Sequence, residues 1–239
     1  MNTVKRAIIL AAGKGNRLRP VTLTTPKPLV KVNGVRMIDS ILQALHKNGI
    51  REIYVVVGYL KEQFSSLPAE YPGLTLIENP DFDTCNNISS LYAAREHLED
   101  AILLDGDLLI QNPKILSPDF EKSGYNAIWT DKETSEWLMT VENGTVISCD
   151  TNGGHSGWQL FSVSRWNSED GKRLKQQVEV EFERGNRQIY WDNVPMTLYL
   201  KDYKLGIYPM QPEDVLEIDS LQELLAQDSS YYLYEENVK

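Results

Sequence analysis

Short apolar runs and amphipathic stretches alternate along the first half of the chain. The runs are typical of strands covered on both faces of a parallel sheet. They lie at 7–10, 53–57, 74–77 and 101–104. Between them, helical spacing of apolar residues predicts helices at 37–48 and 60–67, and another that starts near Asn86–Ser90 and reaches Leu98. Strands alternating with helices predict an α/β fold with right-handed crossovers.

The pattern changes after residue 126, where the strands become shorter. They are expected at 127–130, 137–141, 146–149 and 157–163. Glu142-Asn143-Gly144 is a hairpin turn signal between the second and third of these strands. A long amphipathic helix is predicted over 168–184, ending at Gly185, and a last helix over 220–226.

The first apolar run leads into a glycine loop that is surrounded by positive charge. Gly13 and Gly15 follow the run, and the nearby cations are Lys14, Arg17, Arg19 and Lys27. Without Cβ atoms, such a loop can bring its backbone N–H groups close to an anion, so phosphate binding is predicted. Neither of two common phosphate motifs fits, because a P-loop needs Lys-Ser or Lys-Thr after its second glycine and a dinucleotide fingerprint needs a third glycine.

Composition narrows the class of protein. A length of 239 residues, 41% of them hydrophobic and 24% charged, fits one globular α/β domain. A net charge of −10 argues against nucleic acid or an anionic membrane as a partner. Cys85 and Cys149 lie far apart and are expected to be reduced thiols. There is no long apolar run or cationic leader, so a cytoplasmic protein is expected.

The motif G-x-G-x-R-L-x-P at 13–20, with P-K-P at 26–28, resembles the signature of nucleotidyltransferases that activate sugar phosphates and small phospho-alcohols. Three later segments point to one group within these nucleotidyltransferases, namely Glu136-Trp137, Tyr190–Asn193 and Glu217–Ser220. Together with the GYLKEQF and SLY segments at 58–64 and 90–92, they resemble bacterial CTP:phosphocholine cytidylyltransferases from about Lys5 to Leu225.

The resemblance implies a Rossmann-like fold of the nucleotide-diphospho-sugar transferase type. Its central sheet should be mixed and mostly parallel, flanked by helices, with a small acceptor-binding β/α lid. We expect one domain, with a nucleotide-binding half at 1–125, an acceptor-binding half at 126–227 and a tail at 228–239 to which no function is assigned.

The resemblance also implies the residues of the nucleotide site. The catalytic residues would be Lys27, Arg17 and Asp107. The nucleotide-binding residues would be Leu10, Ala11, Ala12, Gly13, Gly15, Arg17, Lys27, Asn87, Ser89 and Asp105. Asn87 and Ser89 would contact the base, although their residue types are equally typical of helix capping.

Mg²⁺ is the implied cofactor, held by Asp107 and Asp219. Asp107 follows the strand at 101–104, and ligands bind beyond the carboxyl ends of parallel strands. A hard cation prefers such oxygen ligands. The alternatives are that Asp105-Gly106 is only a turn and that Asp219 or Ser220 only caps the last helix.

The expected acceptor site combines aromatic faces with carboxylates. Trp137 and Tyr190 would provide the faces, and Asp192 and Glu217 the negative charge. A quaternary ammonium donates no hydrogen bond and is bound in this way. The competing interpretation is that these aromatic residues only pack, which is the role expected of Trp129, Trp158 and Trp166.

The expected reaction joins CTP and phosphocholine to give CDP-choline and pyrophosphate. Preference for CTP over UTP comes from the resemblance alone. 2-Aminoethylphosphonate or phosphoethanolamine stays open as acceptor, because Asp192 and Glu217 could bind a primary ammonium. A hexose 1-phosphate fits an aromatic and acidic pocket less well. A non-catalytic nucleotide-binding module is the alternative from another class. A monomer or homodimer, with a functional link to a choline kinase, is expected.

Overall fold

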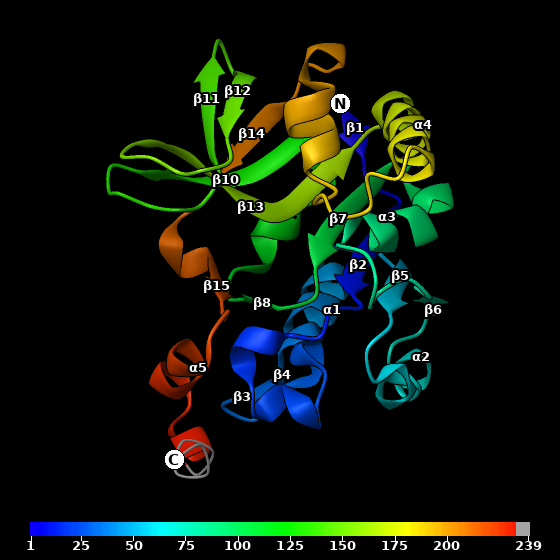
Figure 1. Ribbon diagram of the computed structural model, residues 1–239, viewed down its shortest axis with the longest axis vertical. Helices are drawn as coiled ribbons and strands as arrows, with labels where there is room; N and C mark the ends of the chain where they lie inside the picture. Colours follow the sequence, from blue (N-terminus) through cyan, green and yellow to red (C-terminus); the bar gives the residue numbers. More distant parts are fainter. Residues whose placement is uncertain (233–239) are drawn as a thin grey trace.

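The computed structural model describes residues 1–232, in which nine strands form one sheet (Figure 1). Seven strands follow the order β12-β11-β13-β7-β2-β5-β6, and β10 pairs with β13 and with β14. The strands are β2 (Arg6–Ala11), β5 (Glu52–Val57), β6 (Leu74–Glu78), β7 (Ala101–Asp105), β10 (Gly124–Thr130), β11 (Leu138–Glu142), β12 (Thr145–Asp150), β13 (Gly157–Trp166) and β14 (Gly206–Pro209).

The centre of this sheet is parallel. β2 has β5 on one side and β7 on the other, and both run parallel to it. From β2 the chain first builds outward through β5 to β6 and then returns to place β7 on the opposite side of β2. Such a reversal of strand order opens a crevice at the carboxyl ends of the two strands. Here those ends are Ala11 and Asp105, which places the predicted loop and carboxylates at one edge.

Successive residues of β2 are buried on opposite faces of the sheet. Ile9 belongs to the cluster that includes α1 (Met37–Lys47), and Ile8 to the cluster that includes α3 (Ile88–Ala93) and α4 (Ser168–Glu183). Strands covered by helices on both sides explain the uninterrupted apolar runs of the sequence. The predicted fold, a mixed α/β sheet with a parallel centre flanked by helices, is confirmed.

The second half of the chain extends the sheet with antiparallel strands. β13 pairs antiparallel with β7 and so joins the two halves. β11 and β12 form the predicted hairpin, in which Glu142 pairs with Thr145. Asn143 and Gly144 have φ angles of 48° and 69°, as a two-residue turn with two left-handed residues requires.

Short elements bring the C-terminal segment back to the crevice. β15 (Val215–Glu217) pairs with β8 (Leu108–Ile110), and Glu217 lies opposite Leu108. α5 (Leu221–Gln227) then packs Leu224 into a cluster with Leu18 and Ile218. The remaining elements are β1 (Asn2–Thr3), β3 (Lys31–Val32), β4 (Val35–Arg36), α2 (Leu67–Glu70) and β9 (Asp119–Phe120).

Two predicted helices are shorter than expected. Residues 60–67 form a 3₁₀ turn over Lys61–Phe64, and α2 starts only at Leu67. Pro68 tolerates only the first turn of a helix and disfavours helical geometry before it. The helix expected to reach Leu98 ends at Ala93 and continues as a 3₁₀ turn.

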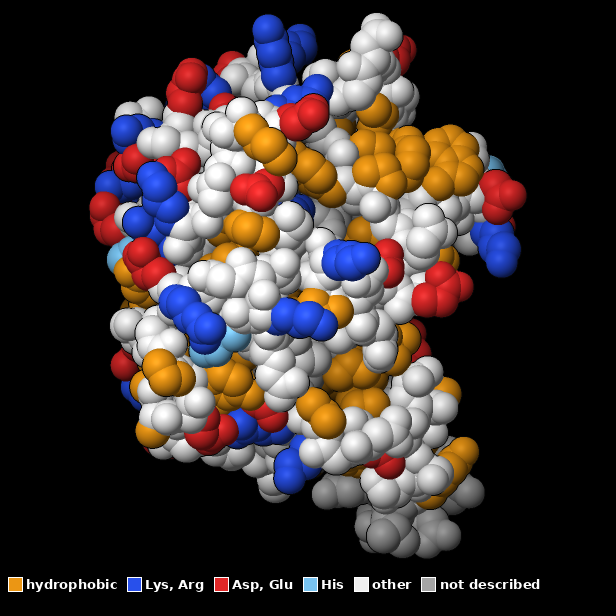
Figure 2. Space-filling model, turned by 180° about the vertical axis from the view of Figure 1, so that it is seen from behind, with side chains coloured by type: hydrophobic (Ala, Val, Ile, Leu, Met, Phe, Trp, Pro, Cys, Tyr) orange, Lys and Arg blue, Asp and Glu red, His pale blue; other side chains and the backbone are white. Residues whose placement is uncertain are grey.

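On the face drawn in Figure 2, acidic and basic side chains of the described residues are interspersed, and neither sign of charge dominates. None of the helices within residues 1–232 has the length and hydrophobicity to cross a bilayer. Of the expected tail, residues 228–232 are described, and Asp228 accepts a hydrogen bond from the N–H of Ser230. Residues 233–239 lie outside the described part of the chain.

Candidate active site

The glycine loop follows β2 directly and is shaped by Gly15. This residue has φ 60° and ψ 40°, a left-handed conformation that favours glycine. A Cβ atom on it would lie 3.0 Å from Cβ of Lys27 and 3.1 Å from Cγ2 of Thr22. The Thr22 hydroxyl also donates to the Gly15 carbonyl oxygen at 2.8 Å. The loop therefore packs tightly against the segment that carries Lys27.

The Lys27 ammonium lies between two carboxylates. Its Nζ donates to Oδ2 of Asp107 at 2.7 Å and to Oδ1 of Asp219 at 2.8 Å. Burial alone would lower the pKa of Lys27, but its attraction and hydrogen bonds to Asp107 and Asp219 raise this pKa above its ordinary value. Lys27 is therefore a charged group in a nearly dry position, with a side chain only 8% exposed.

Asp219 faces the crevice because its neighbour caps the helix. Ser220 accepts from the N–H of Glu223, and Glu223 accepts from the N–H of Ser220, which completes a capping box. The Asp219 side chain is thus free to accept from Lys27 and, at 2.9 Å, from Nη2 of Arg17. Capping by Asp219, one of the alternative explanations, is wrong, whereas capping by Ser220 is confirmed.

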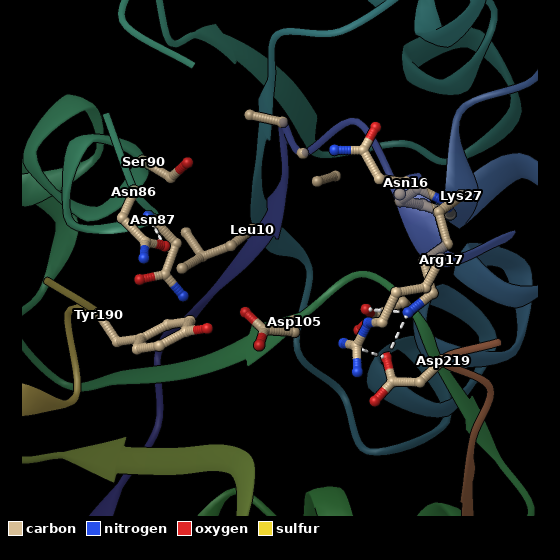
Figure 3. A pocket seen from close by; sticks show the side chains of 16 residues that line it. Leu10, Asn16, Arg17, Lys27, Asn86, Asn87, Ser90, Asp105, Tyr190 and Asp219 are labelled. Atoms are coloured by element: carbon tan, nitrogen blue, oxygen red, sulfur yellow. Dashed lines mark hydrogen bonds and ion pairs between the residues drawn. The ribbon is translucent and has the colours of Figure 1, made fainter. Parts of the chain in front are cut away.

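The nucleotide-side cavity, as we call the first of two cavities at this edge, has a volume of about 420 Å³. In Figure 3, Asn86, Asn87, Ser90 and Tyr190 line one wall, and Arg17, Lys27 and Asp219 lie together on the opposite wall. The expected nucleotide residues that line it are Leu10, Ala11, Ala12, Gly13, Gly15, Arg17, Lys27, Asn87 and Asp105. The cavity therefore has an amide and hydroxyl wall facing a cationic wall.

Ser89 departs from the expected set. It is 2% exposed, and its hydroxyl donates to the Asn86 carbonyl oxygen and accepts from Nδ2 of Asn79. It borders a smaller hollow that Asn79 also lines, whereas Ser90 lines both this hollow and the nucleotide-side cavity. The contact predicted for Ser89 therefore fits Ser90 better. Sequence reasoning missed Asn16, Pro28, Asn86 and Ser90 as lining residues.

The acceptor-side cavity, about 440 Å³ in volume, contains all four residues of the expected acceptor site. The rings of Trp137 and Tyr190 meet edge to face, with centroids 6.1 Å apart and planes at 90°. Asp192 and Glu217 also line this cavity. Ser135, Glu136, Leu160 and Ser162 line it as well and were not singled out from the sequence as site residues.

The two cavities share one boundary. The residues that line both are Arg17, Asn86, Asn87, Asp105, Asp107, Tyr190 and Asp219. A ligand in the nucleotide-side cavity can thus meet a ligand in the acceptor-side cavity beside the two carboxylates that hold Lys27.

Three carboxyl groups in this region have raised pKa values. Burial raises the pKa of Asp192 to about 7, and burial together with Asp107 and Asp219 raises that of Glu217 to about 8. Burial, Asp107 and Asp192 raise the pKa of Asp105 well above its usual range. A cation that entered the acceptor-side cavity would favour the ionised forms and be bound by them.

Asp107 and Asp219 fit a magnesium ion. Oδ1 of Asp107 is buried without a hydrogen-bond partner, and Asp219 approaches the same ammonium. No cluster of three or more His, Cys, Asp and Glu side chains within residues 1–232 could hold a metal ion by itself. Mg²⁺ commonly takes one or two protein carboxylates and completes its shell with substrate phosphates and water. A site that forms only with a bound nucleotide matches this pair.

The tryptophans that were expected only to pack, and the two cysteines that were expected to be reduced, lie outside the two cavities. Trp166 is buried and stacks edge to face on Tyr125, whereas Trp129 is 55% exposed and contacts Trp158. Cys85 and Cys149 are free thiols, as expected.

Known proteins resemble the whole chain. The family model of the MobA-like NTP transferase domain matches residues 7–139. A 2-aminoethylphosphonate cytidylyltransferase from Lancefieldella rimae is 37% identical, covering 94% of this chain and 92% of its own. A choline-phosphate cytidylyltransferase from Streptococcus pneumoniae is 32% identical, covering 91% and 94%. A solved structure of CTP:phosphocholine cytidylyltransferase from Streptococcus pneumoniae superposes with a TM-score of 0.87 at 32% identity, covering 99% of this chain and all of that one. The predicted resemblance is confirmed.

Proposed function

The chain belongs to the MobA-like NTP transferase family, and from this premise we propose that it is a cytidylyltransferase that joins CTP to phosphocholine, giving CDP-choline and pyrophosphate. The observation that carries the proposal is the shared boundary of the two cavities at Arg17, Asp107 and Asp219. One cavity offers a phosphate loop, and the other offers aromatic faces and carboxylates for a cationic head group. The two phosphates would meet where Lys27 lies.

In this reaction an oxygen of the acceptor phosphate attacks the α-phosphorus of CTP. The new P–O bond forms as the bond to the β-phosphate oxygen breaks, and pyrophosphate leaves with that electron pair. The acceptor phosphate is already an anionic nucleophile, so positioning and charge stabilisation supply the catalysis. Lys27 would donate to the approaching phosphate oxygens, while Arg17 and the loop N–H groups would stabilise the pyrophosphate.

Asp107 and Asp219 would hold the magnesium ion. When bound, it would add positive charge beside the phosphates and help to align them. Lys27 occupies the space between these carboxylates and would turn its hydrogen bonds toward the phosphates when the nucleotide binds.

The base would lie against Asn87 and Ser90. The Asn87 side-chain oxygen accepts from the N–H of Trp191 at 2.8 Å, which leaves its amide nitrogen to donate to a carbonyl oxygen of a pyrimidine. Small amide and hydroxyl groups at this wall suit the edge of cytosine.

A second acceptor, 2-aminoethylphosphonate, is favoured by one feature of the acceptor-side cavity. Oδ1 of Asp192 is buried without a hydrogen bond of ordinary geometry, although the Tyr125 hydroxyl interacts with this carboxyl group. A primary ammonium can donate to this oxygen, whereas a trimethylammonium cannot. The relative from Lancefieldella rimae carries the name of this activity.

The test is pyrophosphate release with magnesium and CTP or UTP. Phosphocholine, phosphoethanolamine, 2-aminoethylphosphonate and glucose 1-phosphate would be compared at equal concentration. We expect CTP with phosphocholine to be used best. Preference for a primary amine would replace the acceptor while keeping the reaction, and CTP binding without pyrophosphate release from any of the four would favour a non-catalytic module.

A further inference from the structure

Two loops that are far apart in the sequence are tied together at the edge of the cavities. One spans 84–87 and the other 187–191. Four hydrogen bonds join them: the Asn86 N–H to the Arg187 carbonyl at 2.8 Å, Asn86 Nδ2 to the Gln188 carbonyl at 3.2 Å, Gln188 Nε2 to the Thr84 carbonyl at 2.7 Å, and the Trp191 N–H to Asn87 Oδ1 at 2.8 Å. We call this contact the loop tie.

Both loops contribute to one wall of the substrate cavities. Asn86 and Asn87 belong to the first loop and Tyr190 to the second, and all three line both cavities. Figure 3 shows Tyr190 beside Asn86 and Asn87 on the same wall. The position of the Tyr190 ring therefore depends on the loop that would hold the nucleobase.

Apart from the loop tie, the second loop is held mainly at its two ends, where Arg187 lies over the Phe182 ring, the Tyr190 N–H donates to Asn193 Oδ1 and Trp191 is buried. Residues 185–190 lie outside regular secondary structure, Gln188 is exposed, and the Tyr190 side chain is 52% exposed. Segments with exposed side chains and no regular backbone pairing open most easily. A ligand that orders the first loop would consequently order the second through the loop tie.

We propose that the loop tie couples the two substrate sites, with Gln188 as a positioning residue that contacts neither substrate. This inference rests on the proposed function. Nucleotide binding fixes Asn86 and Asn87, and the acceptor then meets a Tyr190 ring that is already in place. The entropy loss of ordering both loops is borne by the first ligand, so the second binds more tightly. The coupling is reciprocal for equilibrium binding.

The experiment measures acceptor binding by calorimetry with and without cytidine 5′-(α,β-methylene)triphosphate, whose P–C–P bridge prevents release of pyrophosphate. Phosphocholine and 2-aminoethylphosphonate serve as acceptor probes. For the wild-type protein we expect the analogue to tighten acceptor binding about 5- to 10-fold, at the low end of known couplings. In Gln188→Ala this ratio should fall below about 2, while the Kd of the analogue alone changes less than about twofold.

Two further variants separate coupling from folding. Gln188→Glu keeps the size of the side chain but loses the N–H donor to Thr84, so it should lose the coupling as Gln188→Ala does. Gln176→Ala removes an exposed glutamine of α4 and should keep the wild-type ratio. Melting temperatures should stay within a few degrees for all three.

A wild-type ratio near one, or wild-type coupling in both Gln188 variants, would overturn the inference. Failure of the proposed function looks different. In that case neither probe binds in the presence of saturating analogue and no pyrophosphate is released from CTP, which would remove the coupling along with the function.

Discussion

The Lys27 ammonium, held by Asp107 and Asp219, connects the phosphate loop to both proposed magnesium ligands. Replacing Lys27 by methionine keeps an unbranched side chain but removes the charge. We expect turnover of CTP to fall about 10²- to 10³-fold, the usual effect of losing one group that stabilises transition-state charge. The measurement is steady-state pyrophosphate release at saturating substrates.

Folding should suffer less than turnover in this variant. Asp107 would lose its cation, whereas Asp219 would keep its ion pair with Arg17, and both carboxylate side chains remain 24% exposed to water. We therefore expect the free energy of unfolding to fall by about 1–3 kcal/mol, below the range for fully buried pairs. Lys175→Met is the matched control, because it removes one ammonium from an ion pair with Glu96 that lines neither cavity. Wild-type turnover of Lys27→Met would remove this residue from the mechanism.

The pKa of about 7 for Asp192 predicts a pH dependence of acceptor binding. Because its pKa is higher in the folded protein than the usual value near 3.9, the folded state binds more protons and loses stability as the pH rises from about 4 to 7. A cationic head group needs the ionised form. We expect acceptor affinity to rise about tenfold between pH 6 and pH 8, as the ionised fraction grows.

Calorimetric titration of the acceptor at several pH values measures this dependence. Asp192→Asn cannot ionise, so its affinity should change only through the titration of the acceptor's own phosphate and of Glu217, whose pKa is raised to about 8. Equal pH profiles for the wild type and Asp192→Asn would show that Asp192 does not bind the cation.

At the level of elements, the turn after β5 braces the phosphate loop. The Tyr59 N–H donates to the Ala12 carbonyl oxygen at 3.0 Å, and its hydroxyl donates to the Thr22 carbonyl oxygen at 2.9 Å. Gln63 donates to the Thr24 carbonyl oxygen at 2.8 Å. Thr22 in turn holds Gly15, so the GYLKEQF segment fixes the loop from outside the cavity.

Tyr59→Phe removes only the hydroxyl of this brace. We expect the KM for CTP to rise about 3- to 10-fold through a looser loop, with the acceptor KM unchanged. Losing one hydrogen bond costs about 1 kcal/mol, or roughly 2–4 °C in melting temperature for a chain of this size. Tyr208→Phe, which removes a hydroxyl bond to the Lys122 carbonyl oxygen, is the control. Equal KM values for CTP in both variants would refute the brace.

Elements with a strong local pattern were predictable from the sequence. The run 101–104 became β7 at Ala101–Asp105, and the helix expected over 168–184 became α4 at Ser168–Glu183. Burial on both faces or along one helix face leaves a clear mark in the order of residues. The glycine loop was equally clear, because its geometry depends on residues close together in the chain.

Long-range pairing and side-chain direction were not predictable from local pattern. β8 and β15 have three residues each, too few to show a period, yet their pairing brings Glu217 and Asp219 beside Asp107. Asp219 was expected there only through the resemblance. The choice between Ser89 and Ser90 depends on a rotation of about 100° around a helix whose exact start the sequence does not define.

At the scale of the whole molecule, one sheet crosses both expected halves of the chain. β7 from the first half pairs along its length with β13 from the second, and one apolar cluster combines Ile8, Leu103 and Trp166. The halves at 1–125 and 126–227 therefore share a core. If either half unfolded, the other would lose the pairing between β7 and β13 and the apolar contacts across it.

We therefore expect a single cooperative unfolding transition. Scanning calorimetry should give one peak, with the calorimetric enthalpy equal to the van't Hoff enthalpy. Two separable peaks would mean that the halves fold as independent units.

The late position of Asp219 in the chain has a consequence for synthesis on the ribosome. Asp219 follows its partner Lys27 by 192 residues. The growing chain therefore carries a complete glycine loop, Lys27 and Asp107 long before the second carboxylate leaves the ribosome. On the roles proposed for Asp107 and Asp219, a nascent chain would gain activity only after β15 has paired with β8, when the fold is almost closed.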